Sequence, residues 1–289
     1  MGEAGLTGSG WRPNASGYAS QVPAAQAVDD RDPAAMRRFA VELMDETDAI
    51  ALRHLAGGLR VSAKPDTTLV TQVDTEVETV LRGRLAAAFP RHGLVGEEYA
   101  AEAGDGETRW IIDPIDGTHN LVRGIPVFAT LLAVERAGQL LAAVVSAPAL
   151  QRRWHAAGGG GAAVRDLLGE RAIRVSGVDR LADAQVVWSG MRPMEAAGIG
   201  PAVRAIAAAA WRDRGFGDFW GYMLVAEGAA DVMLEIGPTV WDLAAPALIV
   251  REAGGRLTDF GGRDSYDGPQ ALASNGRLHA VIVERLAGE

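Results

Sequence analysis

The chain contains, at residues 110–118, the stretch Trp-Ile-Ile-Asp-Pro-Ile-Asp-Gly-Thr. Its first three residues are apolar and favour a buried strand, so the two aspartates follow at the place where a strand ends. Pro114 fixes a bend in the backbone, and Gly117 permits a conformation that other residues resist. Two carboxylates three residues apart around such a bend converge on one point. The stretch therefore predicts a paired-carboxylate site formed by Asp113 and Asp116.

Two carboxylates held that close repel each other, and burial makes the arrangement costlier. A hard divalent cation removes the repulsion, and ligands that are all oxygen favour Mg²⁺, with Mn²⁺ as a substitute, over zinc. An alternative interpretation is that Asp113 and Asp116 only cap turns, since aspartate is common in turns. The spacing by itself leaves both interpretations open.

Two further acidic segments lie beside predicted elements. Glu97 and Glu98 follow the apolar pair Leu94-Val95, and Asp242 stands at the start of a predicted helix. Negative charge is favoured at a helix N-terminus, so a capping role explains Asp242 equally well. Taken singly, each of these carboxylates is explained by local structure.

The overall composition narrows the classes of partner. The chain has 289 residues, 48% of them hydrophobic, and a formal net charge of −9. It has no cluster of Lys and Arg long enough to bind a polyanion, so we expect neither nucleic acid nor anionic membrane as a partner. It has no cysteine, which excludes disulfides and thiolate nucleophiles. The N-terminus lacks a secretory signal pattern and no apolar run is long enough to span a bilayer, so a cytoplasmic location is expected.

The chain is expected to form one domain behind a flexible arm. Residues 1–31 are rich in Gly, Ala, Ser and Pro and show no sustained period, which is typical of a flexible extension. The remaining length and apolar content predict a single domain over 32–289. We expect it to consist of two tightly packed halves, at about 32–150 and 151–289.

Helix-like and strand-like segments alternate along this domain. Asp32-Pro33 is typical of a helix start, and Gly57-Gly58 is expected to end that helix. The expected helices cover 34–55, 77–88, 219–230 and 241–253, the last closed by Gly254-Gly255. The expected strands cover 110–112, 127–134 and 140–145, with a hairpin between the last two and another hairpin tip at 158–161. This mixture predicts layered helices and sheets, with the sheet partly antiparallel.

The acidic segments occur in an order that resembles the inositol monophosphatase superfamily. The matching motifs are Lys64-Pro65-Asp66, Val70-Thr71 with Asp74, Gly96-Glu97-Glu98, residues 110–118, Trp241-Asp242-Leu243-Ala244 and Glu252-Ala253-Gly254-Gly255. The joint pattern is far more specific than any single motif. The resemblance implies an α/β fold, an alternating α/β/α/β/α sandwich of the inositol monophosphatase and fructose-1,6-bisphosphatase type, with metal ions between its halves.

The resemblance also assigns the site residues. A first Mg²⁺ would be held by Glu97, Asp113 and the Ile115 carbonyl, and a second by Asp113, Asp116 and Asp242. A third, looser ion would use Glu97. Thr118 would pair with Asp74, and together with Glu97 they would orient the attacking water. The resemblance further implies a homodimer.

These roles suit a phosphomonoesterase that hydrolyses a small-molecule phosphate ester with a metal-activated water. Such hydrolysis needs an activated water, neutralised phosphoryl oxygens and a stabilised leaving group, which positioning and electrostatics can supply. We expect Gly117 and Thr118 to open a helix whose backbone N–H groups also hold the phosphate. Thr118 by itself is equally typical of an ordinary helix cap.

Further motifs resemble the histidinol-phosphatase branch of the superfamily, which acts in histidine biosynthesis. They are residues 116–118 with 123–126, residues 146–154, and Gly217-Asp218-Phe219, followed by 225–228. Histidinol phosphate carries an ammonium and an imidazole, and Asp218 or Glu235 near the leaving group would pair with that cation. The resemblance places Asp116 and Asp242 in the substrate site as well. Asp218 has an alternative role as the cap of a helix that begins near Phe219.

Other positions leave the substrate open. His119 stands where the branch usually has lysine, and Leu121 where it usually has an aromatic residue. We expect at most one of Arg152 and Arg153 to point toward the site. The alternative substrates are inositol 1-phosphate or a sugar, nucleotide or secondary-metabolite phosphate. A non-catalytic regulatory homologue would lack a metal ligand, whereas this chain has all four carboxylates.

Overall fold

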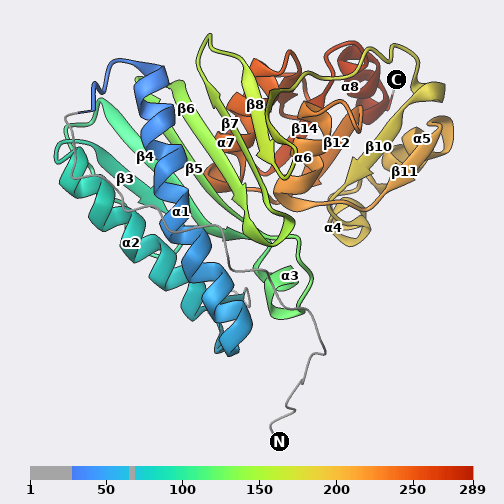
Figure 1. The fold of residues 1–289 in the computed structure, drawn as a ribbon. Coiled ribbons are helices and arrows are strands. Elements are labelled where there is room, and N and C mark those ends of the chain that lie inside the picture. The colour runs from blue at the N-terminus through green and yellow to red at the C-terminus, as the bar shows by residue number, and fades with distance from the viewer. Residues whose placement is uncertain (1–27, 65–68, 289) are drawn as a thin grey trace, which may run out of the picture.

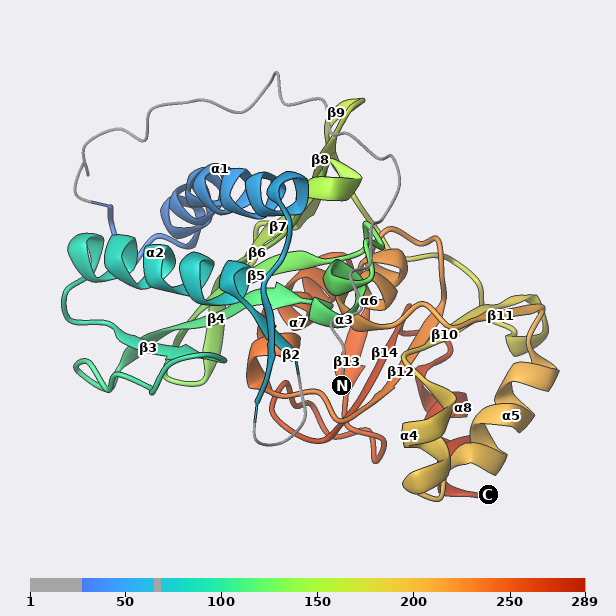
Figure 2. The same ribbon diagram turned by 90° about the horizontal axis from the view of Figure 1, so that it is seen from below.

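Helices and sheets stack in five alternating layers (Figures 1 and 2). The computed structural model describes residues 28–64 and 69–288. A seven-stranded sheet forms the second layer and a five-stranded sheet forms the fourth, with helices outside and between them. The α/β/α/β/α sandwich expected from the sequence is therefore confirmed.

The helices cover both faces of the larger sheet. α1 (Pro33–Gly57) and α2 (Gln72–Ala88) pack on its outer face, and α6 (Asp218–Ala226) and α7 (Val240–Glu252) lie between the two sheets. The remaining helices are the short α3 (Thr118–Val122) and the outer α4 (Met191–Ala196), α5 (Gly200–Ala209) and α8 (His279–Ala287). Because both faces are covered, the central strands are buried on both sides and consist of nearly continuous apolar residues.

The seven-stranded sheet follows the order of the chain and is antiparallel except for one parallel pair, β3 with β4. Its strands are β3 (Gly93–Gly96), β4 (Thr108–Asp116), β5 (Ala129–Arg136), β6 (Gln139–Ala147), β7 (Arg152–Ala157), β8 (Ala162–Asp166) and β9 (Gly169–Ala172). The expected β5–β6 hairpin and the glycine tip at 158–161, between β7 and β8, are confirmed. The sheet takes strands from both sides of residue 150, and the expected division into halves stays a prediction.

The five-stranded sheet has the order β11-β10-β12-β14-β13 and mixes parallel and antiparallel pairs. Its strands are β10 (Gln185–Trp188), β11 (Arg212–Arg214), β12 (Val232–Ile236), β13 (Arg256–Thr258) and β14 (Gln270–Ser274). A separate antiparallel pair, β1 (Val61–Ala63) and β2 (Leu69–Thr71), precedes α2. Two short 3₁₀ turns, Pro148–Leu150 and Leu181–Asp183, complete the fold.

Local signals explain both ends of α1 and the end of α6. The Asp32 side chain accepts a hydrogen bond from Ala34 N at 2.9 Å, and Pro33 occupies the first helical position, as predicted for α1. That helix ends at Gly57-Gly58, also as predicted. α6 ends at Ala226, so the prediction that it reaches residue 230 is wrong. Gly228 adopts a φ of +71° there, and this left-handed conformation ends the helix.

Side-chain alternation along β4 decides which residues face the middle layer. Trp110 and Ile112 pack in the core beneath α1 and α2, whereas Ile111 packs against α6 and α7. With a period of two, Asp113 falls on the face of Ile111. The pairing of β4 with β5 then shifts register between Asp113 and Asp116. This bulge returns Asp116 to the face that α7 covers, because a bulge changes the alternation by one residue.

Parts of the sequence predictions lie outside the described residues. Most of the expected extension at 1–31 does, as do Pro65 and Asp66 of the first motif. In the described remainder of that extension, Asp30 contacts the domain, since its Oδ2 lies 3.2 Å from His92 Nε2 and its carbonyl accepts from Arg136. Within residues 28–64 and 69–288, no helix has both the length and the apolar character needed to cross a membrane.

Candidate active site

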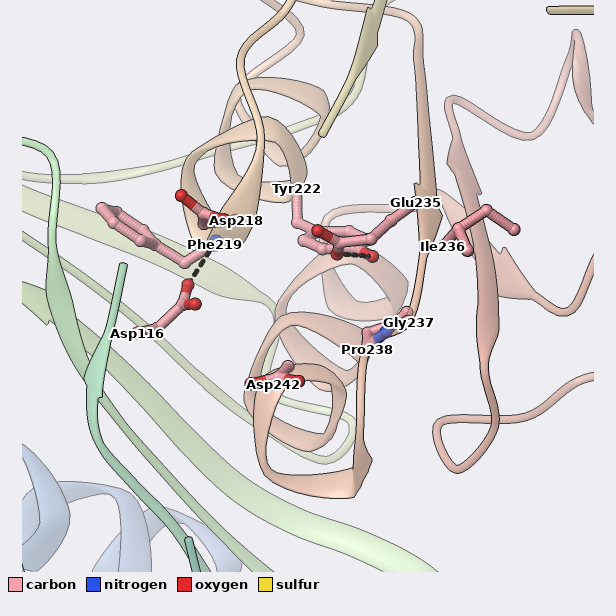
Figure 3. Close-up of a pocket in the computed structure, with 9 residues that line it drawn as sticks. All are labelled: Asp116, Asp218, Phe219, Tyr222, Glu235, Ile236, Gly237, Pro238 and Asp242. Atoms are coloured by element: carbon pink, nitrogen blue, oxygen red, sulfur yellow. Dashed lines mark hydrogen bonds between the residues drawn. The ribbon is translucent and has the colours of Figure 1, made fainter. Parts of the chain in front are cut away.

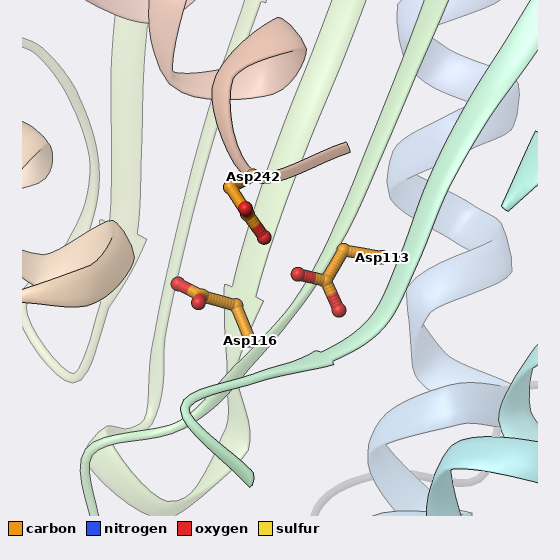
Figure 4. Close-up of side chains that lie close together, drawn as sticks. All are labelled: Asp113, Asp116 and Asp242. Carbon is orange, nitrogen blue, oxygen red and sulfur yellow. The ribbon is translucent and has the colours of Figure 1, made fainter. Parts of the chain in front are cut away.

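Three carboxylates from two layers meet at the end of β4. Asp113, Asp116 and Asp242 each offer one oxygen, and these oxygens lie within 4.8 Å of one another (Figure 4). β4 supplies the first two, and the first turn of α7 supplies Asp242. Asp113 is buried, and its Oδ1 has no hydrogen-bond partner among the described residues. The convergence that the motif predicted is therefore present, with a third member from a distant part of the chain.

The electrostatics of this cluster suit a cation. Burial and then the charges of Asp116, Glu97 and Asp242 raise the pKa of Asp113 well above its usual value. Burial and the charges of Asp218 and Asp242 likewise raise the pKa of Asp116. Oxygen ligands with mutual repulsion and one orphaned buried oxygen fit Mg²⁺, because a divalent ion removes both penalties.

Asp242 acts in a cap and in the cluster at once. It is the third residue of α7 in a capping box, in which its Oδ2 accepts hydrogen bonds from Thr239 N at 2.6 Å and Thr239 Oγ1 at 2.9 Å. Its carboxylate also takes part in the cluster with Asp113 and Asp116 (Figure 4). The capping explanation of Asp242 is thus correct, and it does not exclude a ligand role.

Asp74 has the same arrangement at the start of α2. Its Oδ2 accepts from Thr71 N at 2.9 Å and Thr71 Oγ1 at 2.5 Å, which completes a second capping box. Its Oδ1 faces Thr118, whose hydroxyl lies 2.9 Å away. The expected pairing of Thr118 with Asp74 is present. The same hydroxyl lies 2.8 Å from the carbonyl oxygen of Ile115, so two acceptors compete for one hydrogen.

Gly117 joins β4 to α3 through a conformation that suits glycine. Its φ is +83°, and a β-carbon there would lie 2.9 Å from the carbonyl oxygen of Val127. α3 then begins at Thr118, as expected from the sequence. The turn is therefore too tight for another residue, which keeps Asp116 and Thr118 side by side.

Glu97 lies near enough to the cluster for its charge to affect Asp113, but it is held by a cation. Among the described residues, the three-carboxylate cluster does not include it. Lys64, the only lysine in the sequence, donates to Glu97 Oε1 at 2.8 Å and to Glu98 Oε1 at 2.7 Å. Burial would lower the pKa of Lys64, but these hydrogen bonds outweigh it and raise that pKa. Burial raises the pKa of Glu97 to about 7 despite Lys64, and the charges of Glu98 and Asp242 add to this.

A pocket of about 190 Å³ opens beside the cluster (Figure 3). Its lining residues are Asp116, Asp218, Phe219, Tyr222, Glu235, Ile236, Gly237, Pro238 and Asp242. In the part of the chain that the structure describes, none of the lining residues carries a positive charge. The pocket thus presents four carboxyl groups to whatever enters it.

Asp218 belongs to this pocket rather than to a helix cap. The residue that precedes α6 is Gly217, and no side-chain cap hydrogen bond is made at that N-cap position. Asp218 Oδ2 instead accepts from Asn120 Nδ2 at 3.1 Å, across the two sides of the site. The capping alternative is therefore wrong. Asp218 also has a φ of +56°, a strained conformation for a residue with a side chain, and such strain is concentrated at functional sites.

The backbone and a tyrosine tie the pocket together. Phe219 N donates to Asp116 Oδ2 at 2.5 Å, so the start of α6 holds a cluster carboxylate. Tyr222, one turn later, donates its hydroxyl to Glu235 Oε2 at 2.6 Å (Figure 3). Burial raises the pKa of Glu235 to about 8, although the Tyr222 hydrogen bond opposes the shift. Glu235 is therefore partly neutral at physiological pH when no cation is near.

The comparison with known proteins follows from this site. Residues 32–288 match the inositol monophosphatase family. The chain belongs to this family. It is 44% identical over 252 residues to a protein of Streptomyces coelicolor named histidinol-phosphatase, and the aligned region covers 85% of this chain and 94% of that protein. It is 37% identical over 232 residues to the inositol-1-monophosphatase of Mesorhizobium japonicum, covering 78% and 85%.

Solved structures agree with this assignment. The inositol monophosphatase of Thermotoga maritima is 29% identical, has a TM-score of 0.78 and covers 87% of this chain and 96% of that chain. Family membership and the named relatives make this chain a phosphatase, a hydrolase of phosphate esters. The fold that the sequence resemblance predicted is therefore the fold that this chain shares with the Thermotoga maritima protein.

The structure places the remaining candidates outside the pocket. Arg152 pairs with Glu227 at 3.0 Å and Asp166 at 3.1 Å, and Arg153 pairs with Asp48 at 2.6 Å. The two arginines face opposite sides of β7, and within the described ranges neither lines the pocket.

The two residues that depart from the branch pattern have different positions. His119 is exposed, yet close enough to lower the pKa of Asp218, which burial raises. Leu121 is fully buried and packs in the core beneath α1 and α2. The departure at 121 therefore changes the core under α3, whereas the one at 119 lies near a pocket residue, Asp218.

Sequence reasoning missed Tyr222 and Asn120. Tyr222 stands four residues after Asp218, a helical spacing that puts both on one face of α6. Asn120 directly follows the aspartate motif, but its contact with Asp218 joins residues 98 positions apart. The helical spacing of Asp218 and Tyr222 was visible in the sequence, whereas nothing in the sequence marked the contact between Asn120 and Asp218.

Proposed function

We propose that this enzyme is a Mg²⁺-dependent phosphomonoesterase that hydrolyses histidinol phosphate to histidinol and phosphate. The observation that carries the proposal is the three-carboxylate cluster beside a pocket that has further carboxyl groups and, among the described lining residues, no positive charge. Support for the substrate comes from the relative named histidinol-phosphatase at 44% identity.

The residues that would hold the ions come from the end of β4, from the bend after β3 and from the start of α7. Glu97, Asp113 and the Ile115 carbonyl would bind a first Mg²⁺, and Asp113, Asp116 and Asp242 a second, with Glu97 available to a third. Bound Mg²⁺ lowers the pKa of a water ligand and neutralises charge on the phosphoryl oxygens. Lys64 occupies only Oε1 of Glu97, so Oε2 is available as a ligand.

Thr118 and Asp74 would orient the attacking water. With the Ile115 carbonyl engaged by the first Mg²⁺, the carboxylate of Asp74 would accept the single hydroxyl hydrogen of Thr118, and the Thr118 oxygen would accept a hydrogen from water. Asp74 is itself fixed by two hydrogen bonds from Thr71 and cannot rotate away. Glu97 would accept the second hydrogen of the same water. The backbone N–H groups of Gly117 and Thr118 would hold the phosphate oxygens.

The pocket carboxylates would select the leaving group. Asp218 and Glu235 flank the cavity beside Asp242. Burial raises the pKa of Glu235, and the negative charges of Asp218 and Asp242 raise it further. A cationic leaving group offsets that repulsion, whereas a neutral polyol supplies only hydroxyl donors. The second candidate substrate is inositol 1-phosphate, favoured by the relative named inositol-1-monophosphatase at 37% identity.

The test is phosphate release from histidinol phosphate, inositol 1-phosphate and adenosine monophosphate, each with Mg²⁺ and with EDTA. We expect the highest kcat/KM on histidinol phosphate and no release in EDTA. The substrate proposal fails if histidinol phosphate is the poorest of the three. The metal proposal fails if EDTA leaves the rates unchanged. Light scattering of the same samples tests the expected homodimer.

A further inference from the structure

Glu97 lies in a segment that the sheet does not hold. It follows β3, in the bend at residues 97–99, where the described residues form no strand ladder. A ligand on such a bend needs support from elsewhere, because a shift of about 1 Å in a ligand is enough to impair a site. The source of that support is a buried carboxylate on α2.

Glu78 is fully buried and accepts hydrogen bonds from the backbone of this bend. Its Oε2 accepts from Glu98 N at 2.8 Å, and its Oε1 lies 3.3 Å from Tyr99 N. Arg82, one turn later on α2, donates to Oε1 at 2.8 Å and offsets the charge. Two consecutive N–H groups just after Glu97 are therefore held by one ionised side chain, and such charge-assisted bonds are the strong ones.

The residue before Glu97 leaves room for this contact. The Glu78 carboxylate lies directly against the backbone of Gly96, and a β-carbon at Gly96 would clash with that carboxylate. The Glu78 carboxylate can therefore lie this close to the bend only because residue 96 is glycine. Asp74 and Glu78 also stand four residues apart and so share one face of α2. The first holds Thr118 and the second holds the Glu97 bend.

We propose that Glu78 is a positioning residue that sets the Glu97 carboxylate toward Asp113 and Asp242 for metal binding. The proposal rests on the ligand role proposed for Glu97. Glu78 touches neither the cluster nor the pocket, so its effect acts through the bend. The alternative is that Glu78 only stabilises the fold.

The experiment is titration calorimetry of the full chain with MgCl₂ alone, on the wild type and on Glu78→Gln. Glutamine keeps the size and one acceptor for Glu98 N, but its amide nitrogen then replaces Oε1, the oxygen that accepts from both Tyr99 N and Arg82. We expect the affinity of the site that uses Glu97 to fall about 10- to 100-fold, the usual effect of losing a group that orients a ligand. The Mg²⁺ concentration for half-maximal phosphate release should rise in parallel.

Gly96→Ala tests the same contact from the other side and should weaken Mg²⁺ binding in the same direction. Val77→Ala is the matched control, because Val77 is the neighbouring residue on α2, is fully buried and packs only in the core. It should lower Tm and leave Mg²⁺ affinity unchanged.

The proposal is overturned if folded Glu78→Gln and Gly96→Ala bind Mg²⁺ as the wild type does. It is also overturned if Val77→Ala weakens Mg²⁺ binding as much as they do. Glu97→Ala separates this failure from failure of the proposed site. If Glu97→Ala binds Mg²⁺ normally, the ligand role of Glu97 is wrong whatever Glu78 does.

Discussion

Replacing Asp113 by asparagine should move stability and activity in opposite directions. The substitution keeps the shape of a buried side chain and removes its charge. In the wild type that charge sits beside Asp116 and Asp242, with Oδ1 unsatisfied within the described structure. A residue that merely caps a turn would lose stability when changed. A metal ligand surrounded by other acids should instead gain stability in metal-free protein.

The size of the gain follows from the geometry. Two unit charges 4.8 Å apart repel by about 3.5 kcal/mol at an effective dielectric constant of about 20. Protonation of the acids, whose pKa values are raised, already relieves part of this repulsion in the wild type. We therefore expect about 2 kcal/mol of added stability in EDTA, which corresponds to a rise in Tm of about 5 °C.

Thermal denaturation with EDTA and with saturating Mg²⁺ measures the first effect, and phosphate release measures the second. Wild-type Tm should rise when Mg²⁺ is added, because a ligand that binds only the folded state stabilises it. The Tm of Asp113→Asn should rise less or not at all. Its kcat/KM should fall about 10³-fold, since metal ions supply several kcal/mol of transition-state stabilisation.

Asp48→Asn is the matched control, another buried aspartate in a different charge environment. Arg153 donates to Asp48 at 2.6 Å and Ser146 donates at 2.9 Å. Loss of the Asp48 charge leaves the buried Arg153 with Asp45, at 2.8 Å, as its remaining carboxylate partner, so stability should fall by about 2 kcal/mol while activity of the folded protein persists. The reasoning is refuted if Asp113→Asn destabilises the metal-free protein, or keeps both the Mg²⁺-induced rise in Tm and near-normal turnover.

Three further predictions concern the pocket and one buried histidine. Asp218→Asn should raise KM for histidinol phosphate about 10-fold, the value of one charge-assisted hydrogen bond, and leave kcat/KM on inositol 1-phosphate nearly unchanged; equal losses on both substrates would contradict a role in recognising the cation. In EDTA, the folded-state pKa of about 8 for Glu235 means that the folded chain keeps a proton that the unfolded chain has lost. The free energy of unfolding should therefore fall as pH rises from about 5 to about 8, and Glu235→Gln should flatten that slope in urea denaturation. Burial lowers the pKa of His279, which lies between Thr258 and Ser274, to about 4. Stability is then lost as pH falls from about 6.5 to about 4, by about 2 kcal/mol after solvent screening, and an unchanged slope in His279→Gln would rule out this source.

Much of the fold was predictable because its signals are local. Asp32-Pro33 and Gly57-Gly58 marked the ends of α1, and the turn at 136–138 marked the β5–β6 hairpin. Errors occurred where a tertiary contact or a special backbone conformation prevailed. α6 ends early at a left-handed glycine, and Asp218 begins it without capping it. An aspartate before a helix looks the same in sequence whether it caps the helix or lines a pocket.

The candidate site shows the same division. Spacing after an apolar strand pointed to Asp113 and Asp116, because buried carboxylates are costly, whereas only the resemblance to the family added Asp242 to them. Only the folded chain shows that Lys64 holds Glu97, that Asn120 holds Asp218 and that Glu78 holds the bend of Glu97. Each of these contacts joins residues from separate parts of the fold, and their meeting depends on how the layers pack.

The sequence by itself determined the class of chemistry, starting from the aspartates of residues 110–118 and the order of motifs around them. The tertiary structure decided what those aspartates face. A bulge in β4 turns Asp116 back toward α7, and the capping box of α7 aims Asp242 at Asp113. Side-chain period reveals which face of a strand is buried, but the partner across that face is chosen by packing between layers.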